Sequence, residues 1–476
     1  MSEAVKEFSG IGDSAIDYSA IEYSAIVPVP KEARHYGFWD MVATWIGANA
    51  CTSSWYTGGV LAAVGIGGAF AVIFIANPIA YVIMALVGYM GYKIGTTTMG
   101  LTRATFGVRG SILPSTLNSI QFIGWCSVNT FIAAISMSFL FSTLFGWPAF
   151  GEPNSWWVMV IGIVLCSTLQ ILLTVLGGSY SIKYGERVAV ILLIILTIWQ
   201  TVVILRHFSV DKIMSWVPPA DLRIQFGVAM DVMVAFSFGW VPAIAEFTRY
   251  TKNKSSATLA PMLGANVSLF WFAIVGLFSV VASVLLTGTF DPNASDPSSI
   301  VAALGLGWVA FLVLVLATVS TNAVNIYVAG MSVANIFPKA NQKRVVLYVA
   351  FVTLAFSLIP LLVGSFLDTF MGFLGYVGLI FAPLLGIMLV DFYLINGRNY
   401  DWSQANKVDG KFWYSNGINW TTITCWSIGV VTYFIMLRVD FVMNSMGAIY
   451  ATLIVVAVLY FIVAKVQQKK NVQLSA

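Results

Sequence analysis

The sequence predicts an all-α integral membrane protein with twelve transmembrane helices, and three observations lead to this prediction. Hydrophobic residues make up 59% of the 476 residues and charged residues only 9%, whereas a typical soluble domain has about 25% charged residues. About twelve apolar runs are long enough to cross a bilayer, which takes about 20 residues. Lys and Arg are concentrated in alternate loops. This composition excludes a soluble enzyme and a nucleic-acid-binding protein, and the lipid bilayer is the partner it implies.

The expected spans follow directly from the apolar runs, and the charges of the loops give their orientation. The runs lie at 37–62, 68–92, 112–142, 156–178, 187–206, 224–246, 264–287, 300–331, 345–365, 369–396, 418–438 and 446–465. With the N-terminus inside, the inner segments carry twenty Lys and Arg residues and the outer segments only four. By the positive-inside rule, both termini are expected in the cytoplasm of a multi-pass inner-membrane or plasma-membrane protein.

The first and the sixth predicted spans are the most interrupted by small and polar residues. Span 1 contains Asn49 followed by a Thr-Ser-Ser run at 52–54, and span 6 contains Gly239 and Pro242. Proline lacks a backbone donor and ends or kinks a helix, and transporters often break helices near the membrane midplane. Because the two spans are five apart, they favour two inverted repeats of five helices. Two kinked helices with small-residue packing faces are the alternative.

This organisation divides the chain into five segments. Residues 1–36 are a cytoplasmic tail, 37–206 the first repeat, 207–396 the second repeat, 397–465 the last two helices, and 466–476 a second cytoplasmic tail. The first tail repeats Ser-Ala-Ile every five residues, a period that fits neither helix nor strand, so it is expected to be disordered.

The sequence indicates a transporter that is not an enzyme and needs no cofactor. The four cysteines all fall in apolar runs without a CxxC pair, and only two histidines occur. Buried free thiols behave as small hydrophobic groups, which disfavours a disulfide framework or zinc site. A membrane-embedded enzyme would need a histidine cluster or paired acids at the midplane, and a passive channel would need rings of polar residues; neither pattern is visible.

Two further spans carry polar side chains that could bind a ligand. In span 3, Trp125 and Asn129 are four residues apart and share one helix face, so a flat heterocycle could stack on the indole and bond to the amide. In span 8, Ser320, Thr321 and Asn325 belong to a dense polar stretch, whose oxygens suit a small hard cation. A packing tryptophan and a polar seam between helices are the respective alternatives.

Four acidic residues lie in or near the predicted spans: Asp40, Asp231, Glu246 and Asp391. Structural or gating roles are favoured for all four. They form no chain of acids and histidines, which disfavours a proton pump.

Motifs in order along the chain carry a family resemblance. They are Trp45-Ile-Gly-Ala-Asn49, Thr57-Gly-Gly59, Thr102-Arg-Ala-Thr-Phe-Gly-Val-Arg-Gly-Ser111, Gly124-Trp125, Glu246-Phe-Thr-Arg-Tyr250, Ser320-Thr-Asn322, Gly386-Ile-Met-Leu-Val-Asp391-Phe-Tyr-Leu394 and Gly417-Ile-Asn-Trp420. From about Lys31 to Lys465 the chain resembles the nucleobase:cation symporter-1 family. The resemblance implies the LeuT-like five-plus-five inverted-repeat fold of the APC superfamily, with discontinuous helices 1 and 6 and alternating access.

The resemblance also implies a substrate site between spans 1, 3, 6 and 8 and a nearby cation site. Trp125 and Trp240 would sandwich a flat ring, and Asn129 and Asn325 would bond its edge. The remaining residues implied at the substrate site are Asn49, Ser53 and Gly239. For the cation, Na+, the ligands implied are the carbonyls near Gly47, Ala50 and Ala317 and the hydroxyls of Ser320 and Thr321.

In its site pattern the chain is most similar to purine–cytosine permeases. The resemblance therefore implies cation-coupled import of a neutral nucleobase, with cytosine or a purine favoured. A hydantoin or allantoin permease, or a permease for a pyrimidine precursor of thiamine, is the alternative within the family. An amino-acid transporter on the same fold is a more distant one, because it would not need two tryptophans. Na+ is favoured as the coupling ion, with H+ as the alternative.

Overall fold

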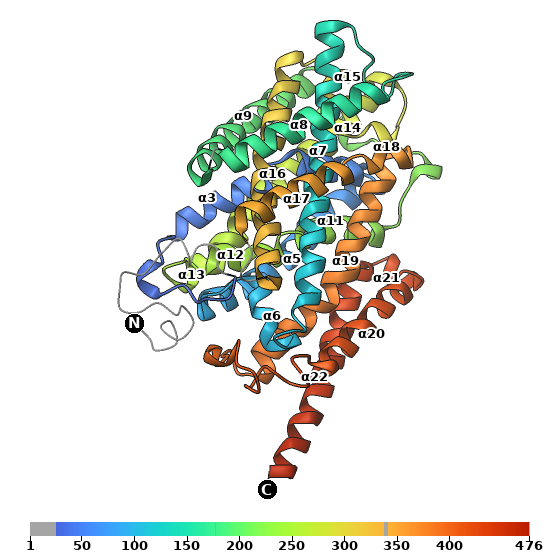
Figure 1. Cartoon of the computed structure of the whole chain (residues 1–476). Helices are drawn as coiled ribbons and strands as arrows, with labels where there is room; N and C mark the ends of the chain where they lie inside the picture. The colour runs from blue at the N-terminus through green and yellow to red at the C-terminus, as the bar shows by residue number, and fades with distance from the viewer. Residues whose placement is uncertain (1–24, 177, 338–340, 476) are drawn as a thin grey trace.

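A computed structural model describes residues 25–176, 178–337 and 341–475, which form a bundle of helices (Figure 1). Nine helices within these residues are long and apolar enough to cross a membrane. They are α5 (Ile66–Ile94), α7 (Ile112–Phe145), α8 (Trp156–Leu176), α9 (Gly178–His207), α11 with α12 (Phe226–Phe238 and Ile244–Thr248), α14 (Leu259–Thr287), α16 (Trp308–Ile336), α19 (Phe366–Val390) and α22 (Gly447–Ser475).

The other three predicted spans form interrupted or shorter helices. Span 1 is divided into α3 (Phe38–Asn49) and α4 (Thr52–Val60), span 9 into α17 (Gln342–Phe356) and α18 (Ile359–Val363), and span 11 is α20 (Trp420–Met436). Short helices fill the loops: α6 (Thr98–Phe106), α10 (Val210–Met214), α13 (Lys254–Ala257), α15 (Pro297–Ala303) and α21 (Asp440–Met443).

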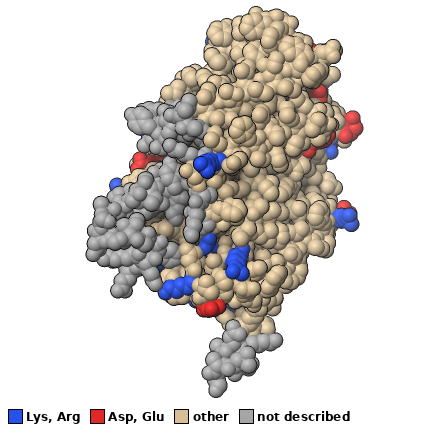
Figure 2. All heavy atoms as spheres, in the orientation of Figure 1, with Lys and Arg blue, Asp and Glu red and all other residues tan. Residues whose placement is uncertain are grey.

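The surface is consistent with a lipid environment around this bundle. The face seen in Figure 2 is largely uncharged, with only scattered acidic and basic side chains. Large apolar side chains are exposed on outward helix faces, for example Ile191 and Ile195 of α9. A soluble protein rarely exposes contiguous apolar surface on this scale.

The first helix breaks in the middle of the protein. Ala50 leaves the helical conformation with ψ 70°, Cys51 is extended, and α4 begins at Thr52. Every residue of α4 is buried. Non-helical backbone at membrane depth is tolerated only where protein or a water-filled cavity surrounds it, so this break is a protected feature of the interior.

The sixth span breaks in a comparable way. Helix α11 ends at Phe238, a short 3-10 turn follows over Val241–Ala243, and α12 resumes at Ile244. Pro242 lies within the turn, where its missing donor does not interrupt an α-helical hydrogen bond.

Helix α5 ties both breaks to one another. The side-chain amide of Asn49, at the end of α3, donates to the hydroxyl of Tyr81 on α5 at 2.9 Å. The hydroxyl of Ser237, near the end of α11, donates to Asn77 Oδ1 on α5 at 3.0 Å. All four side chains are buried, so these hydrogen bonds satisfy polar groups that would otherwise be costly in the interior.

Glycines let α4, the second half of span 1, pack closely on α14. A Cβ atom on Gly58 would lie 2.1 Å from the carbonyl oxygen of Ala273, and one on Gly276 would lie 2.0 Å from the carbonyl oxygen of Trp55. Small residues at such crossings allow helix backbones to approach in membranes. This contact accounts for Gly58 of the Thr57-Gly-Gly59 motif.

Two further motifs, around Gly107 and around Gly417, meet in the structure. Gly107 has φ +94° and a Cβ there would lie 2.5 Å from the carbonyl oxygen of Gly417, and the backbone amide of Arg109 donates to that oxygen at 2.8 Å. Nearby, Arg103 donates to the side chain and backbone of Asn335 at 2.8 and 3.0 Å. Burial lowers the pKa of Arg103 to about 10, so it stays cationic at neutral pH.

The N-terminal segment differs from the expected disordered tail. We define it as residues 25–30; within it Ala25, Ile26 and Val29 are buried. Thr97 donates to the carbonyl of Ala25 at 2.7 Å, and the indole of Trp402 donates to that of Ile26 at 3.0 Å. The segment is ordered because its backbone acceptors find buried donors. Residues 1–24, with the other two Ser-Ala-Ile copies, lie outside the described residues.

At the C-terminal end α22 continues through Ser475, so residues 466–475 of the predicted second tail extend this helix.

Candidate functional site

A pocket with about 280 Å³ of empty space lies where the two helix breaks meet α7 and α16. Its lining comes from span 1 (Cys51, Ser53), α7 (Phe122, Trp125, Asn129), the α11 break (Phe236, Gly239, Trp240) and α16 (Thr321, Asn325). The lining contains no charged side chain among the described residues, so the pocket suits a neutral ligand.

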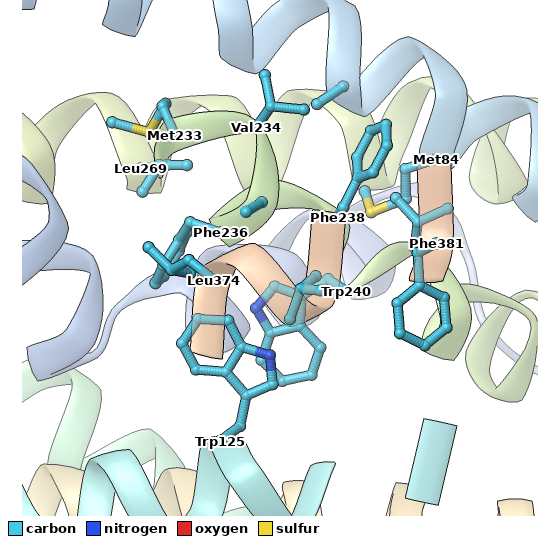
Figure 3. Packing of buried hydrophobic residues seen from close by; sticks show 14 of the residues in the cluster. Met84, Trp125, Met233, Val234, Phe236, Phe238, Trp240, Leu269, Leu374 and Phe381 are labelled. Atoms are coloured by element: carbon cyan, nitrogen blue, oxygen red, sulfur yellow. The ribbon is translucent and has the colours of Figure 1, made fainter. Parts of the chain in front are cut away.

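Aromatic side chains form most of the pocket wall. Trp125 packs edge-to-face on Phe236 and Phe373, with ring centroids 5.3 and 4.9 Å apart. Trp240 packs edge-to-face on Trp45, at 5.8 Å. Figure 3 shows Trp125 extending from α7 into the same part of the core as Trp240 and Phe236. Such edge-to-face contacts are a preferred arrangement of buried aromatic rings.

Gly239 allows the indole of Trp125 to reach the break in α11. A Cβ on Gly239 would lie 2.7 Å from Trp125 Nε1. The side chain of Gln121 fixes the same turn, because its Nε2 donates to the carbonyl oxygen of Gly239 at 2.8 Å. The break therefore presents a glycine because a side chain would collide with the tryptophan.

Amide side chains form the polar wall. Asn129 Nδ2 donates to Asn322 Oδ1 at 3.0 Å, and Asn325 Nδ2 donates to the same oxygen at 3.3 Å. Asn322 Nδ2 donates to the carbonyl oxygen of Cys126 at 2.9 Å. Asn129 and Asn325 line the pocket, whereas Asn322 lies behind them.

The residues expected to bind a cation lie where span 1 approaches α16. The hydroxyls of Thr52 and Thr318 are 3.0 Å apart, which joins α4 to α16 at this level. Ser320 and Thr321 are both buried, and Thr321 Oγ1 donates to the carbonyl oxygen of Ala317 at 3.0 Å.

The backbone at the break in span 1 supplies the other expected ligands. The amide of Ala50 donates to the carbonyl oxygen of Gly47 at 3.1 Å, and a carbonyl oxygen has a second lone pair for a further partner. Within the described residues, His, Cys, Asp and Glu form no group able to hold a metal ion. The ligands available here are therefore neutral oxygen atoms, which suit Na+ better than a transition metal.

The structure brings most of the predicted substrate residues together but places one elsewhere. Trp125, Asn129, Trp240, Gly239, Asn325 and Ser53 all line the pocket. Asn49 does not, because its amide is held by Tyr81 and by the carbonyl oxygen of Ala265 at 3.4 Å. Its position at the end of α3 points it toward α5 and α14 instead.

Three pocket residues were not predicted from the sequence. They are Cys51, Phe122 and Phe236. Helical spacing offers a signal for the two phenylalanines, because each lies three residues before Trp125 or Gly239 and therefore on the same helix face. Cys51 was interpreted only as a small buried hydrophobic group.

The four acidic residues near the spans make local contacts instead of lining the pocket. Asp40 accepts from the backbone amide at the start of α3 at 2.9 Å. Asp231 accepts from two amides of the first turn of α22, at 2.8 and 2.9 Å. Glu246 accepts from the hydroxyl of Thr98 at 2.9 Å. Asp391 accepts from two tyrosine hydroxyls, at 2.6 and 2.8 Å.

Known sequences resemble this chain over nearly its whole length. A protein of Bacillus subtilis (strain 168) provisionally named a purine-cytosine permease is 25% identical, over 93% of this chain and 96% of its own. The allantoin permease of the same organism is 24% identical, over 92% of each chain. The cytosine permease of Escherichia coli (strain K12) is 25% identical, over 85% of this chain and 87% of its own.

Solved structures share the fold. Mhp1, a nucleobase-cation-symport-1 family transporter solved in a closed conformation with bromovinylhydantoin bound, matches with a TM-score of 0.76 at 20% identity, covering 94% of this chain and 96% of that one. MhsT in complex with L-phenylalanine matches with a TM-score of 0.59 at 14% identity, covering 90% and 99%.

The family assignment rests on the sequence match. Residues 28–462 match the family described as permease for cytosine/purines, uracil, thiamine, allantoin. This match confirms the resemblance to the nucleobase:cation symporter-1 family and the prediction of a transporter. The chain belongs to this family and is a multi-pass membrane permease, not an enzyme.

Proposed function

We propose that this permease is a secondary active symporter that imports a neutral nucleobase, with cytosine or a purine favoured, together with a cation. The observation that carries the proposal is the pocket, which combines two tryptophans with neutral amides at the breaks of spans 1 and 6. Stacking on aromatic faces accepts any flat base, and amide groups add hydrogen-bond selection at the edge. A zwitterionic amino acid would bring a carboxylate into this pocket, whose described lining residues include no cationic side chain to pair with it.

The transport cycle requires an arrangement that gives access from both sides in turn. We assign twelve spans, with residues 37–206 and 207–396 as inverted repeats and 397–465 as two additional helices. Both termini are assigned to the cytoplasm, because the inner loops then carry most of the Lys and Arg residues. Alternating access would move one group of helices against the other around the pocket.

We assign Na+ as the co-transported ion. The carbonyls of Gly47, Ala50 and Ala317 and the hydroxyls of Ser320 and Thr321 would bind it. The assignment of these ligands is supported by their chemistry, because neutral oxygen atoms that suit a hard cation lie at the junction of span 1 and α16. Proton coupling is the alternative, and the acids nearest the spans are already engaged in local hydrogen bonds.

A hydantoin or allantoin permease is the second candidate. Its support is the similarity to the allantoin permease of Bacillus subtilis. The same alternative includes a permease for a pyrimidine precursor of thiamine, because the family description names thiamine. An amino-acid substrate has weaker support, because the likeness to MhsT at 14% identity concerns the fold only.

Thermal unfolding of the purified protein with a panel of neutral heterocycles, each with and without Na+, tests the proposal. A ligand that binds the folded state raises the melting temperature. We expect cytosine or a purine to stabilise the protein, and more strongly when Na+ is present. Stabilisation by hydantoins or allantoin alone would favour the second candidate, and stabilisation by amino acids alone would refute both.

Substitutions on α16 test the cation assignment. Thr321→Ala and Ser320→Ala should abolish the additional effect of Na+ while substrate still raises the melting temperature at high concentration. Ser332→Ala is the matched control, because Ser332 is a buried hydroxyl on the same helix that bonds to the carbonyl oxygen of Val328. A full Na+ effect in Thr321→Ala would contradict the assignment.

A further inference from the structure

The carbonyl group of Gly239 lies in the break of span 6 and loses both of the donors that a continuous helix would give it. The residue three positions further on is Pro242, which has no backbone N–H. The amide of the next residue, Ala243, donates instead to the carbonyl oxygen of Trp240 at 3.0 Å. Because an unpaired carbonyl at membrane depth is costly, this break needs a donor from elsewhere.

Gln121 of α7 supplies that donor. Its Nε2 lies 2.8 Å from the carbonyl oxygen of Gly239, and the amide must present its nitrogen there because a carbonyl oxygen can only accept. The side chain of Gln121 is fully buried. Its Oε1 has no hydrogen-bond partner within the described part of the chain. A buried glutamine with one polar group unpaired is an unfavourable way to fill a helix interface, which indicates a role beyond packing.

The hydrogen bond holds the peptide group from which Trp240 extends. The carbonyl of Gly239 and the amide of Trp240 belong to one planar unit, so the bond also limits where the Cα atom of Trp240 lies relative to α7. On α7, Gln121 lies one turn before Trp125. Both tryptophans line the pocket, and Figure 3 shows their indoles in the same part of the core. One side chain thus connects the two walls that would enclose a flat ligand.

Resting on the stacking site of the function proposed above, we infer that Gln121 is a positioning residue for substrate binding. It holds Trp240 at the distance from Trp125 that admits a flat ring between them, with its side-chain amide in place of the backbone donor that Pro242 removes. Gln121 itself lies outside the described lining of the pocket, so it acts through Trp240 and not by contact with the ligand. A wall held in place before binding raises affinity, because less order has to be imposed when the ligand arrives.

The effect of Gln121→Met on ligand affinity tests the inference in the purified full-length protein. Methionine is close to glutamine in length but cannot donate a hydrogen bond. The dissociation constant of cytosine or adenine, whichever the wild type binds more tightly, should rise about 2- to 10-fold, which corresponds to the net contribution of one hydrogen bond. An unchanged dissociation constant in Gln121→Met would overturn the inference and leave the nucleobase function standing. Binding of neither base by the wild type would overturn the proposed function and this inference with it.

A double-mutant cycle with Trp240→Ala separates positioning from a general loss of structure. If Gln121 acts through Trp240, Gln121→Met should hardly change the dissociation constant of the Trp240→Ala protein, because the indole to be positioned is gone. An equal rise in both backgrounds would refute the positioning role. Asn118→Leu is the matched control, because Asn118 is a buried amide one turn earlier on α7 whose Nδ2 donates to Ser332 Oγ at 2.8 Å. It should leave the dissociation constant unchanged, and a rise equal to that of Gln121→Met would also refute the inference.

Pro242→Ala tests whether Gln121 replaces the missing backbone donor, and it also covers the case in which Gln121→Met alone does not fold. The change restores an N–H three residues after Gly239. The neighbouring amides of Trp240 and Ala243 already donate to carbonyl oxygens three residues back, at 3.3 and 3.0 Å, so the new amide can bond to Gly239 in the same way. In this background Gln121→Met should fold and should leave the dissociation constant as it is in Pro242→Ala. A higher dissociation constant in the double variant would refute the replacement.

Discussion

Replacement of Trp125 by alanine tests the pocket most directly, because the loss of substrate affinity and the loss of stability that it causes can be measured separately. Stacking of a base on an aromatic side chain contributes about 1–3 kcal/mol. Its loss should raise the dissociation constant of the substrate roughly 5- to 140-fold, since about 1.4 kcal/mol corresponds to a factor of ten. The indole is only 5% exposed, so the change also leaves a cavity.

The cost to stability follows from the contacts of the same ring. Trp125 loses edge-to-face contacts with Phe236 and Phe373, each worth about 0.5–1.5 kcal/mol beyond burial. Removing a buried tryptophan costs about 3–5 kcal/mol in total. The ligand-free Trp125→Ala protein should therefore melt at a lower temperature. Trp125→Phe keeps a ring in place and should lose less of both stability and affinity.

Trp426→Ala separates these effects. Trp426 lies on α20, is half-buried, and donates to the carbonyl oxygen of Ile380 at 3.2 Å, away from the pocket. It should lower the melting temperature without changing the dissociation constant measured by calorimetry below that temperature. Unchanged affinity in Trp125→Ala, or an equal loss in Trp426→Ala, would refute the stacking argument.

Three further predictions concern stability. Asp231→Ala leaves two amides of the first turn of α22 without their acceptor and should cost on the order of 2–3 kcal/mol, seen as a lower melting temperature; Asp231→Asn should lose less. Gly58→Val should lower the free energy of unfolding by at least about 1–3 kcal/mol, because a Cβ there meets the backbone of Ala273. Gly67→Ala is the control, because open space surrounds a Cβ at that position, and its melting temperature should match that of the wild type. Trp402→Phe keeps an aromatic ring but loses the hydrogen bond to the N-terminal segment, which contributes about 1 kcal/mol. It should speed tryptic cleavage after Lys31, the residue that follows this segment; an unchanged cleavage rate would contradict the contact.

Much of the architecture could be predicted because its causes are local in sequence. A run of apolar residues long enough to cross a bilayer has few alternatives. The small and polar residues of span 1 and Pro242 of span 6 each lie beside a break: α4 begins at Thr52, directly after the break in span 1, and Pro242 lies in the 3-10 turn of span 6. The spacing of Trp125 and Asn129 likewise places both on one face of a helix. Such features need no knowledge of the neighbouring helix, and the structure places both residues in the pocket.

Other features depend on contacts with side chains that are distant in the sequence. Asn49 looked like a ligand for substrate, but Tyr81 on another helix holds its amide. The N-terminal segment looked disordered, yet donors such as Thr97, distant in sequence, hold its backbone. A local sequence pattern does not show which side chain of another helix a residue will contact. The roles of these residues were therefore predicted from residue type alone.

The sequence by itself determined that this chain is a membrane permease and that spans 1 and 6 are interrupted, because length, hydropathy and the placement of small and polar residues are properties of single segments. Only the tertiary structure decided how the pocket amides are turned. Asparagine can donate or accept with equal ease, and its direction is fixed by the backbone carbonyl of Cys126 through Asn322. The direction of each amide depends on a partner from another helix, so it is a property of the assembled hydrogen-bond network.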